Sequence, residues 1–135
     1  MSKKLFVEIV SPEHEVWAGE GDMVIAKTID GEIGVQPGHV PVLALLAPGS
    51  VVRILGGRET GEVRAAAHAG FISVSDDNRV SILAETAELA EEIDVERARR
   101  ALADAESGGI SPEDPEAQAR AARARSRLEA AGTAA

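Results

Sequence analysis

Residues 28–43 read Thr28-Ile29-Asp30-Gly31-Glu32-Ile33-Gly34-Val35-Gln36-Pro37-Gly38-His39-Val40-Pro41-Val42-Leu43. This segment places three glycines and two prolines between two runs with strand character. Glycine adopts positive φ at little cost, and proline fixes φ and removes a backbone donor, so the backbone is closely specified here. The segment predicts a pair of tight turns in a small β domain, with His39 in the loop between the prolines.

Strand signals continue on both sides of this segment, up to about residue 90. Turn residues separate short apolar runs at intervals of about eight to twelve residues, a spacing typical of antiparallel sandwiches and barrels. We predict turns at residues 11–13 and 76–78 and a hairpin turn at Gly56-Gly57. The predicted strands are Leu5–Val10, Asp22–Thr28, Val51–Leu55, His68–Ser75 and Arg79–Leu83. Together they indicate an N-terminal antiparallel β-sandwich over residues 1–88.

Composition limits the class of protein. A chain of 135 residues with 44% hydrophobic residues fits one compact domain, or one domain with an appendage. Its aromatic residues are few (Phe6, Trp17 and Phe71), so we expect an aliphatic core. The absence of cysteine excludes disulfides and thiolate chemistry, and the net charge of -9 argues against broad nucleic-acid binding. A charge comes too early for a signal peptide, and the apolar run 40–47 is too short for a membrane span, so we expect no membrane insertion.

Beyond residue 90 the pattern becomes helical and rich in alanine. Asp94 is the predicted N-cap of a first helix that ends at residues 107–109, and Ser111 is the predicted N-cap of a second helix with Pro112 at its first position. The apolar stripes at helical spacing are Val95, Ala98, Leu102 and Ala105, then Ala117, Ala121, Ala124 and Leu128. They predict a C-terminal two-helix antiparallel hairpin over residues 89–135, and hence a fold that is mainly β with α.

Docking of this hairpin is expected to be weak. Its stripes hold only two leucines and one valine. A fully buried leucine or valine contributes about 1.5–3 kcal/mol, and an alanine contributes much less. A weakly docked hairpin is either a poorly ordered tail or an arm that leaves one site for another.

Arginines cluster on the second helix. Arg120, Arg123 and Arg127 fall on one helical face, and residues 117–128 contain no acidic side chain. Such a stripe suits an acidic partner surface or a phosphate, unless it is simply a solvated helix face.

Several motifs, in their order along the chain, resemble the epsilon subunit of the F-type ATP synthase. The resemblance spans nearly the whole chain, and its most specific part is residues 31–41. The other matching motifs are Leu46-Ala47-Pro48-Gly49, Gly70-Phe71-Ile72-Ser73-Val74, Val80-Ser81-Ile82-Leu83-Ala84-Glu85-Thr86-Ala87 and Ile93-Asp94-Val95-Glu96-Arg97-Ala98. This family implies a β-sandwich followed by a helical hairpin, without catalysis of its own.

The resemblance also implies partners. An epsilon subunit is part of the rotating central stalk, binds the gamma subunit and the c-ring, and helps couple proton flow to ATP synthesis. Its hairpin can extend to the catalytic beta and alpha subunits and restrain ATP hydrolysis, and the complex places it peripherally at the cytoplasmic face of the cell membrane. Glu32 and His39 fall where family members face the c-ring and gamma. Arg120, Arg123 and Arg127 would face an acidic segment of a catalytic beta subunit.

Some family members bind ATP on the folded hairpin, through a motif that residues 93–98 match. No cofactor is required, and ATP is the expected regulatory ligand. A helix N-terminus and converging guanidinium groups suit phosphates, but Asp104 stands where nucleotide-binding relatives carry a further arginine. In the alternative interpretation, Asp94 is only an N-cap and Arg97 only a salt-bridge partner. The residues that the resemblance assigns to ATP are Glu88, Ile93, Asp94, Arg97, Ala98, Arg123 and Arg127.

Two alternatives belong to other functional classes. A cupin-like metal enzyme could use His14, His39 and His68, but the sequence lacks the clustered ligands that such enzymes need. It also lacks a Gly-x-Ser-x-Gly elbow, and residues 56–61 lack the end of a phosphate loop. The other alternative is a free-standing adaptor whose hairpin lies in a partner's groove.

Overall fold

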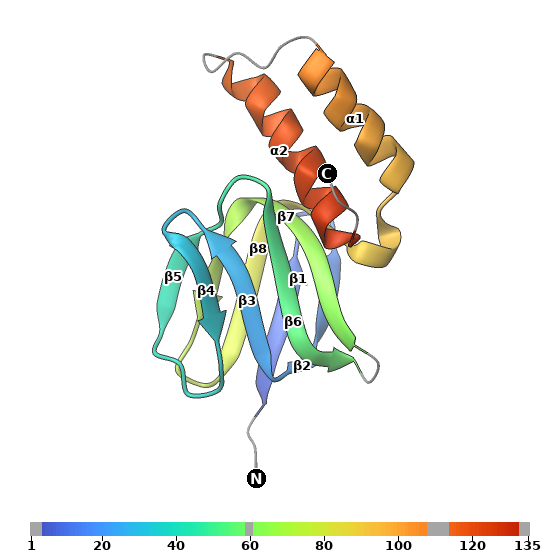
Figure 1. Cartoon of the computed structure of the whole chain (residues 1–135). Helices are drawn as coiled ribbons and strands as arrows, with labels where there is room; N and C mark the ends of the chain where they lie inside the picture. The colour runs from blue at the N-terminus through green and yellow to red at the C-terminus, as the bar shows by residue number, and fades with distance from the viewer. Residues whose placement is uncertain (1–3, 59–60, 108–113, 133–135) are drawn as a thin grey trace.

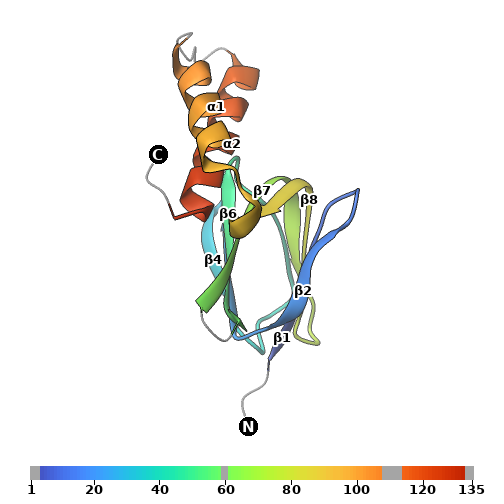
Figure 2. The same cartoon turned by 90° about the vertical axis from the view of Figure 1, so that its right-hand side faces the viewer.

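The computed structural model describes residues 4–58, 61–107 and 114–132. Two layers of strands lie face to face, and two helices stand on one end of them (Figures 1 and 2). The strands are β1 (Leu5–Val10), β2 (Glu15–Gly21), β3 (Met23–Thr28), β4 (Gly31–Val35), β5 (Val42–Leu45), β6 (Ser50–Arg58), β7 (Gly61–Val74) and β8 (Arg79–Leu89). They are followed by the short 3₁₀ helix η1 (Ala90–Glu92) and the helices α1 (Val95–Ser107) and α2 (Pro115–Ala130). The predicted fold class is confirmed.

The long strand β7 joins the two layers. Its first half pairs with β6 and its second half with β5, while β8 pairs along nearly its whole length. The strand order is β2-β1-β8-β7-β6-β3-β4, with β5 beside β7, so the sheet folds over on itself. Among the described strand pairs, β1 with β8 is parallel and the others are antiparallel, which departs from a purely antiparallel sandwich. The chain passes from strand to helix at residues 89–90, and the predicted domain boundary after residue 88 stays a prediction.

The core between the layers is aliphatic, as predicted. Leu5, Val7 and Ile9 are almost fully buried and alternate with less buried residues, which is the pattern of a strand with one face inward. Valine, isoleucine and alanine from β3, β6, β7 and β8 complete this core, and Trp17 packs at its margin.

The predicted hairpin turn at Gly56-Gly57 is wrong. Strand β6 continues to Arg58, which pairs with Gly61, and the register shifts between Ile54 and Arg58. Gly56 has φ of +76°, and a Cβ there would lie 2.2 Å from a carboxylate oxygen of Asp22. The glycine therefore serves a bulge in a strand rather than a turn between strands.

The hairpin helices pack against each other through the two predicted stripes. Ala98, Leu102 and Ala105 of α1 form one cluster with Ala121, Ala124 and Leu128 of α2. The predicted start of the second helix is wrong, because Asp114 is the N-cap and accepts hydrogen bonds from the backbone N–H groups of residues 116 and 117. Pro115 has no N–H to bond within a helix begun earlier, so the helix starts at this proline. Ser111 and Pro112 lie outside the described residues.

Helix α2 joins the hairpin to the sandwich, where it packs on β6 and β7. The Ser126 hydroxyl donates a buried hydrogen bond of 2.8 Å to the Ser50 carbonyl oxygen. Gly49, in the turn before β6, lies so close to the backbone of α2 that a Cβ there would lie 2.6 Å from the Ala122 carbonyl oxygen. Ala130 packs with the buried Ala66 and Ile93. The interface is thus built from small side chains.

Candidate functional site

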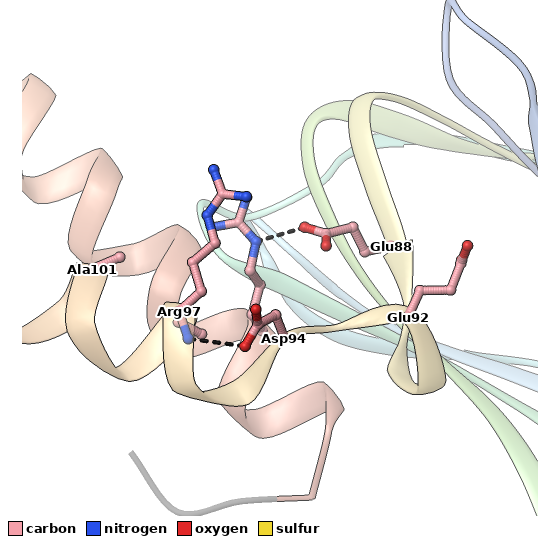
Figure 3. A pocket seen from close by; sticks show the side chains of 7 residues that line it. Glu88, Glu92, Asp94, Arg97 and Ala101 are labelled. Atoms are coloured by element: carbon pink, nitrogen blue, oxygen red, sulfur yellow. Dashed lines mark hydrogen bonds and ion pairs between the residues drawn. The ribbon is translucent and has the colours of Figure 1, made fainter.

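A pocket of about 360 Å³ lies where the end of β8, η1 and the first turn of α1 meet α2 (Figure 3). The side chains of Glu88, Asp94 and Arg97 face this space from β8 and the start of α1. Glu88, Glu92, Asp94, Arg97, Ala98, Ala101 and Arg127 line it. The fold therefore collects acidic and basic groups from elements far apart in the sequence.

Asp94 caps the first helix, as predicted. Its carboxylate accepts a hydrogen bond of 3.1 Å from the backbone N–H of Arg97, and its carbonyl oxygen accepts one of 3.0 Å from the N–H of Ala98. These bonds fix the position of Arg97 in the first helical turn. Within the described ranges, no carboxylate forms an ion pair with the Arg97 guanidinium, so its five N–H donors remain for the pocket.

Glu88 and Arg127 join the sandwich to the hairpin. Arg127 Nε donates to Glu88 Oε1 across 2.6 Å. Both side chains are partly exposed, Arg127 to 28% and Glu88 to 37%. This charge-assisted hydrogen bond orients the guanidinium at the pocket wall.

A second depression of about 520 Å³ adjoins the first and shares Ala101 and Arg127 with it. Arg120, Arg123 and Arg127 all line it, so they share one face of α2 as the spacing indicated. Asp104 and Ala105 of α1 form the opposite wall. Arg120 also lies 3.4 Å from Glu116, and Asp104 brings negative charge beside the arginines.

The structure therefore brings together most of the predicted nucleotide residues. Glu88, Asp94, Arg97, Ala98 and Arg127 line the first pocket, and Arg123 lines the second. Ile93 lines neither and is buried with Ala66 and Ala130 beneath the end of α2.

Sequence reasoning missed Glu92 and Ala101 of the first pocket. Glu92 accepts a hydrogen bond of 3.3 Å from the N–H of Leu89, which closes the short turn of η1. An acidic residue just before the motif was the available signal for it. For Ala101 the sequence held no signal other than its position one helical turn after Arg97.

His68 has a different environment from the one that sequence reasoning considered. It lies on β7 beneath α2 and is 5% exposed, and among the residues that the structure describes neither ring nitrogen has a hydrogen-bond partner. Burial, together with Arg127 and Arg123, lowers its pKa from 6.5 to about 4, although Glu88 acts in the opposite direction. In the part of the chain that the structure describes, no group of three or more acidic or histidine side chains is placed to hold a metal ion.

Glu32 and His39 lie at opposite ends of β4. Glu32 is exposed beside the β3–β4 turn and faces Lys27 in the register of the two strands. His39 follows β4 in a loop that is tied to the β7–β8 turn, because Gly38 N–H donates to Asn78 Oδ1 across 2.7 Å. The two predicted contact residues are thus not brought together.

An exposed apolar row crosses the outer face of one layer, and the sequence analysis did not single it out. Leu45 pairs with Phe71, Phe71 with Leu83, and Leu83 with Val10, so the four residues stand side by side on β5, β7, β8 and β1. Leu45 is 57% exposed, while Phe71 and Leu83 are 36% and 38% exposed. Clusters of exposed large apolar side chains are typical of protein–protein contacts.

None of the helices in the described ranges has the length and apolarity needed to span a bilayer.

Comparison with known proteins identifies the family. Residues 4–90 match the family described as "ATP synthase, Delta/Epsilon chain, beta-sandwich domain". An ATP synthase epsilon chain of Thermobifida fusca (strain YX) is 73% identical over 131 residues, which cover 97% of this chain and 94% of the relative. One from Streptomyces griseus is 53% identical over 102 residues, which cover 76% and 80%.

A solved structure is also similar. It is described as the Euglena gracilis mitochondrial ATP synthase, OSCP/F1/c-ring in rotational state 1, and one of its chains matches with a TM-score of 0.72 at 25% identity. The match covers 94% of this chain and 78% of that one. The present chain belongs to the family of ATP synthase epsilon chains.

Proposed function

We propose that this chain is a rotor-stalk subunit that joins the gamma subunit to the c-ring and has no catalytic site of its own. The apolar row of exposed Leu45, Phe71 and Leu83 with the half-buried Val10 at its end is the observation that carries this proposal. A row of this kind in water is unfavourable unless a partner covers it. Gamma is the partner that we assign to it.

We assign the c-ring contact to the β3–β4 turn. Glu32 is exposed there and offers a carboxylate to basic groups of the ring loops. An exposed ion pair contributes only about 0–1 kcal/mol, so Glu32 would set the register of the contact rather than its strength. His39, near the other end of β4, would extend the gamma contact. The chain would then lie peripherally at the cytoplasmic face of the membrane.

We further propose that the hairpin restrains ATP hydrolysis only after it leaves the sandwich. In the docked arrangement Arg123 and Arg127 line a depression between α1 and α2, and Arg127 is bound to Glu88. Release of α2 would free these guanidinium groups for an acidic segment of a catalytic beta subunit. The small side chains of the docked interface support release, because little apolar area is lost.

ATP is the ligand that we propose for the two adjoining pockets. Arg97, Arg123 and Arg127 supply cationic donors, and the first turn of α1 supplies backbone N–H groups. Bound ATP would hold the hairpin docked, since its contacts come from both the sandwich and the hairpin. Asp104 repels phosphate, so we expect binding in the millimolar range rather than tighter.

Gamma binding tests the central proposal. Purified gamma is titrated with the chain and with Leu45→Glu and Leu83→Glu variants, each checked by circular dichroism for an intact sandwich. Each variant should weaken binding at least tenfold. The matched control is Ile29→Glu, which is 58% exposed but lies off the row, and it should bind normally. Unchanged binding by both row variants would overturn the assignment.

A further inference from the structure

Helix α2 of the hairpin, the part of the chain proposed above to move, covers His68. On β7 it shares a face with Ala66, two residues earlier, and Ala66 packs against Ala130 of α2. A cavity of about 200 Å³ beside the imidazole is lined by Ala119, Ala122 and Arg123 of the same helix. Removal of α2 would therefore expose His68 to water.

The charges around His68 oppose a second proton on its ring. Arg123 of α2 lines the cavity beside the ring, and the charges of Arg123 and Arg127 of α2 disfavour a proton on it, while Glu88 of β8 favours one. The Glu88 carboxylate is engaged by Arg127 at 2.6 Å. The turn before β6 contributes only Pro48 and Gly49, which carry no charge.

The hydrogen-bond environment acts in the same direction. An imidazolium needs acceptors for two N–H groups, and within the described residues neither ring nitrogen has a partner. A charged ring would be buried without acceptors and beside two guanidinium groups, whereas a released ring would be hydrated.

We infer that His68 makes docking of the hairpin depend on pH: the hairpin docks over the neutral imidazole, and protonation of His68 favours its release. This device goes beyond the proposed role in ATP synthase and does not depend on it, because it concerns the chain alone.

The direction and size of the pH effect on docking follow from the linkage between proton binding and docking. The docked state lowers the pKa of His68 to about 4, so it binds fewer protons than the released state, in which the ring has its usual value of 6.5. Docking is therefore fully favoured above pH 6.5 and weakens as the pH falls towards 4. From pH 7.5 to 5.5 the ratio of released to docked hairpin should rise about tenfold.

Thiol protection measures this ratio in the full chain. The sequence has no cysteine, so Ala130→Cys introduces a single thiol at a site that is 1% exposed under the docked helix. Its rate of reaction with a neutral disulfide reagent is divided by the rate in the urea-unfolded chain at the same pH. This quotient gives the released fraction even when release is rare.

We expect the quotient to rise about tenfold from pH 7.5 to 5.5 in the reference chain. His68→Ala and His68→Gln should reduce the rise to less than twofold, while His14→Ala, at an exposed turn histidine, should keep it. The inference is overturned if the quotient of the reference chain does not change with pH, or if it rises just as much in both His68 variants. The ring of His68, followed by NMR in the unmodified chain, gives a check that needs no variant: titration near pH 6.5 with the hairpin docked would also overturn it.

Discussion

Replacement of Gly49 by alanine should weaken docking of the hairpin while leaving the sandwich folded. The new Cβ would lie 2.6 Å from the Ala122 carbonyl oxygen, and ordinary van der Waals contact begins at 3.4 Å. Helix α2 would have to retreat by about 0.8 Å to relieve this overlap. Such a shift would stretch the 2.8 Å hydrogen bond between Ser126 and Ser50 beyond hydrogen-bonding range.

The expected cost follows from the contacts that are lost. The hydrogen bond contributes about 0.5–1.5 kcal/mol, and loosening the buried methyl of Ala130 costs up to about 0.8 kcal/mol. Docking should therefore weaken by about 1–2 kcal/mol, which raises the released fraction about 5- to 30-fold. Gly49 also has φ of +69°, and alanine there adds about 1–2 kcal/mol of backbone strain to docked and released states alike.

The thiol at position 130 measures the released fraction, and Gly38→Ala is the matched control. Gly38 has φ of +88°, but a Cβ there would meet nothing within 4 Å. Both variants should lower the melting temperature of the sandwich, and only Gly49→Ala should expose the thiol. Equal thiol protection in the two variants would refute the steric argument for the docked interface.

Three further predictions concern the proposed partners and ligand. Glu32→Lys should weaken coupling through charge repulsion at the c-ring, and normal ATP-driven proton pumping in membrane vesicles would contradict this. Asp104→Arg should tighten ATP binding about tenfold or more by replacing a repulsive charge with an attractive one; calorimetry that finds no heat at millimolar ATP in either chain would remove the nucleotide site. Combined replacement of Arg120, Arg123 and Arg127 by alanine should relieve inhibition of ATP hydrolysis, whereas Arg100→Ala, on the exposed side of α1, should not; inhibition that survives the triple change would contradict the assigned role.

Local patterns predicted most of the fold. The alternation of Leu5, Val7 and Ile9 needs only one inward face, so it was readable without the partner strands. Strand β2 was missed because its residues, Glu15–Gly21, include two glycines and few apolar side chains. Its pairing with β1 defines it, and that pairing is not local.

The two wrong boundaries have a common cause. Gly56 and Pro112 each carry a strong local signal, but contacts outside the local sequence decide that β6 continues past Gly56 and that α2 begins at Pro115. Asp114-Pro115 repeats the pattern of a cap followed by proline, and β6 absorbs Gly56 as a bulge against Asp22. Such competition is decided by packing, which the local sequence does not contain.

The candidate site likewise has a part that is local in the sequence and a part that depends on tertiary packing. Asp94, Arg97 and Ala98 lie within a single helical turn, so their convergence follows from the motif. The bond between Glu88 and Arg127 joins residues 39 apart. The burial of His68 likewise depends on how α2 docks, and an apolar row made by register across four strands is invisible to a pattern read along one strand.

Inhibition of ATP hydrolysis most directly tests the proposal that the sandwich binds the complex and the hairpin restrains hydrolysis. A catalytic head depleted of its epsilon subunit is titrated with the full chain and with a version that ends after Ala90. The full chain should lower the hydrolysis rate saturably, and the shortened chain should bind without doing so. If neither chain binds a competent head from the same source, the proposed stalk function is contradicted.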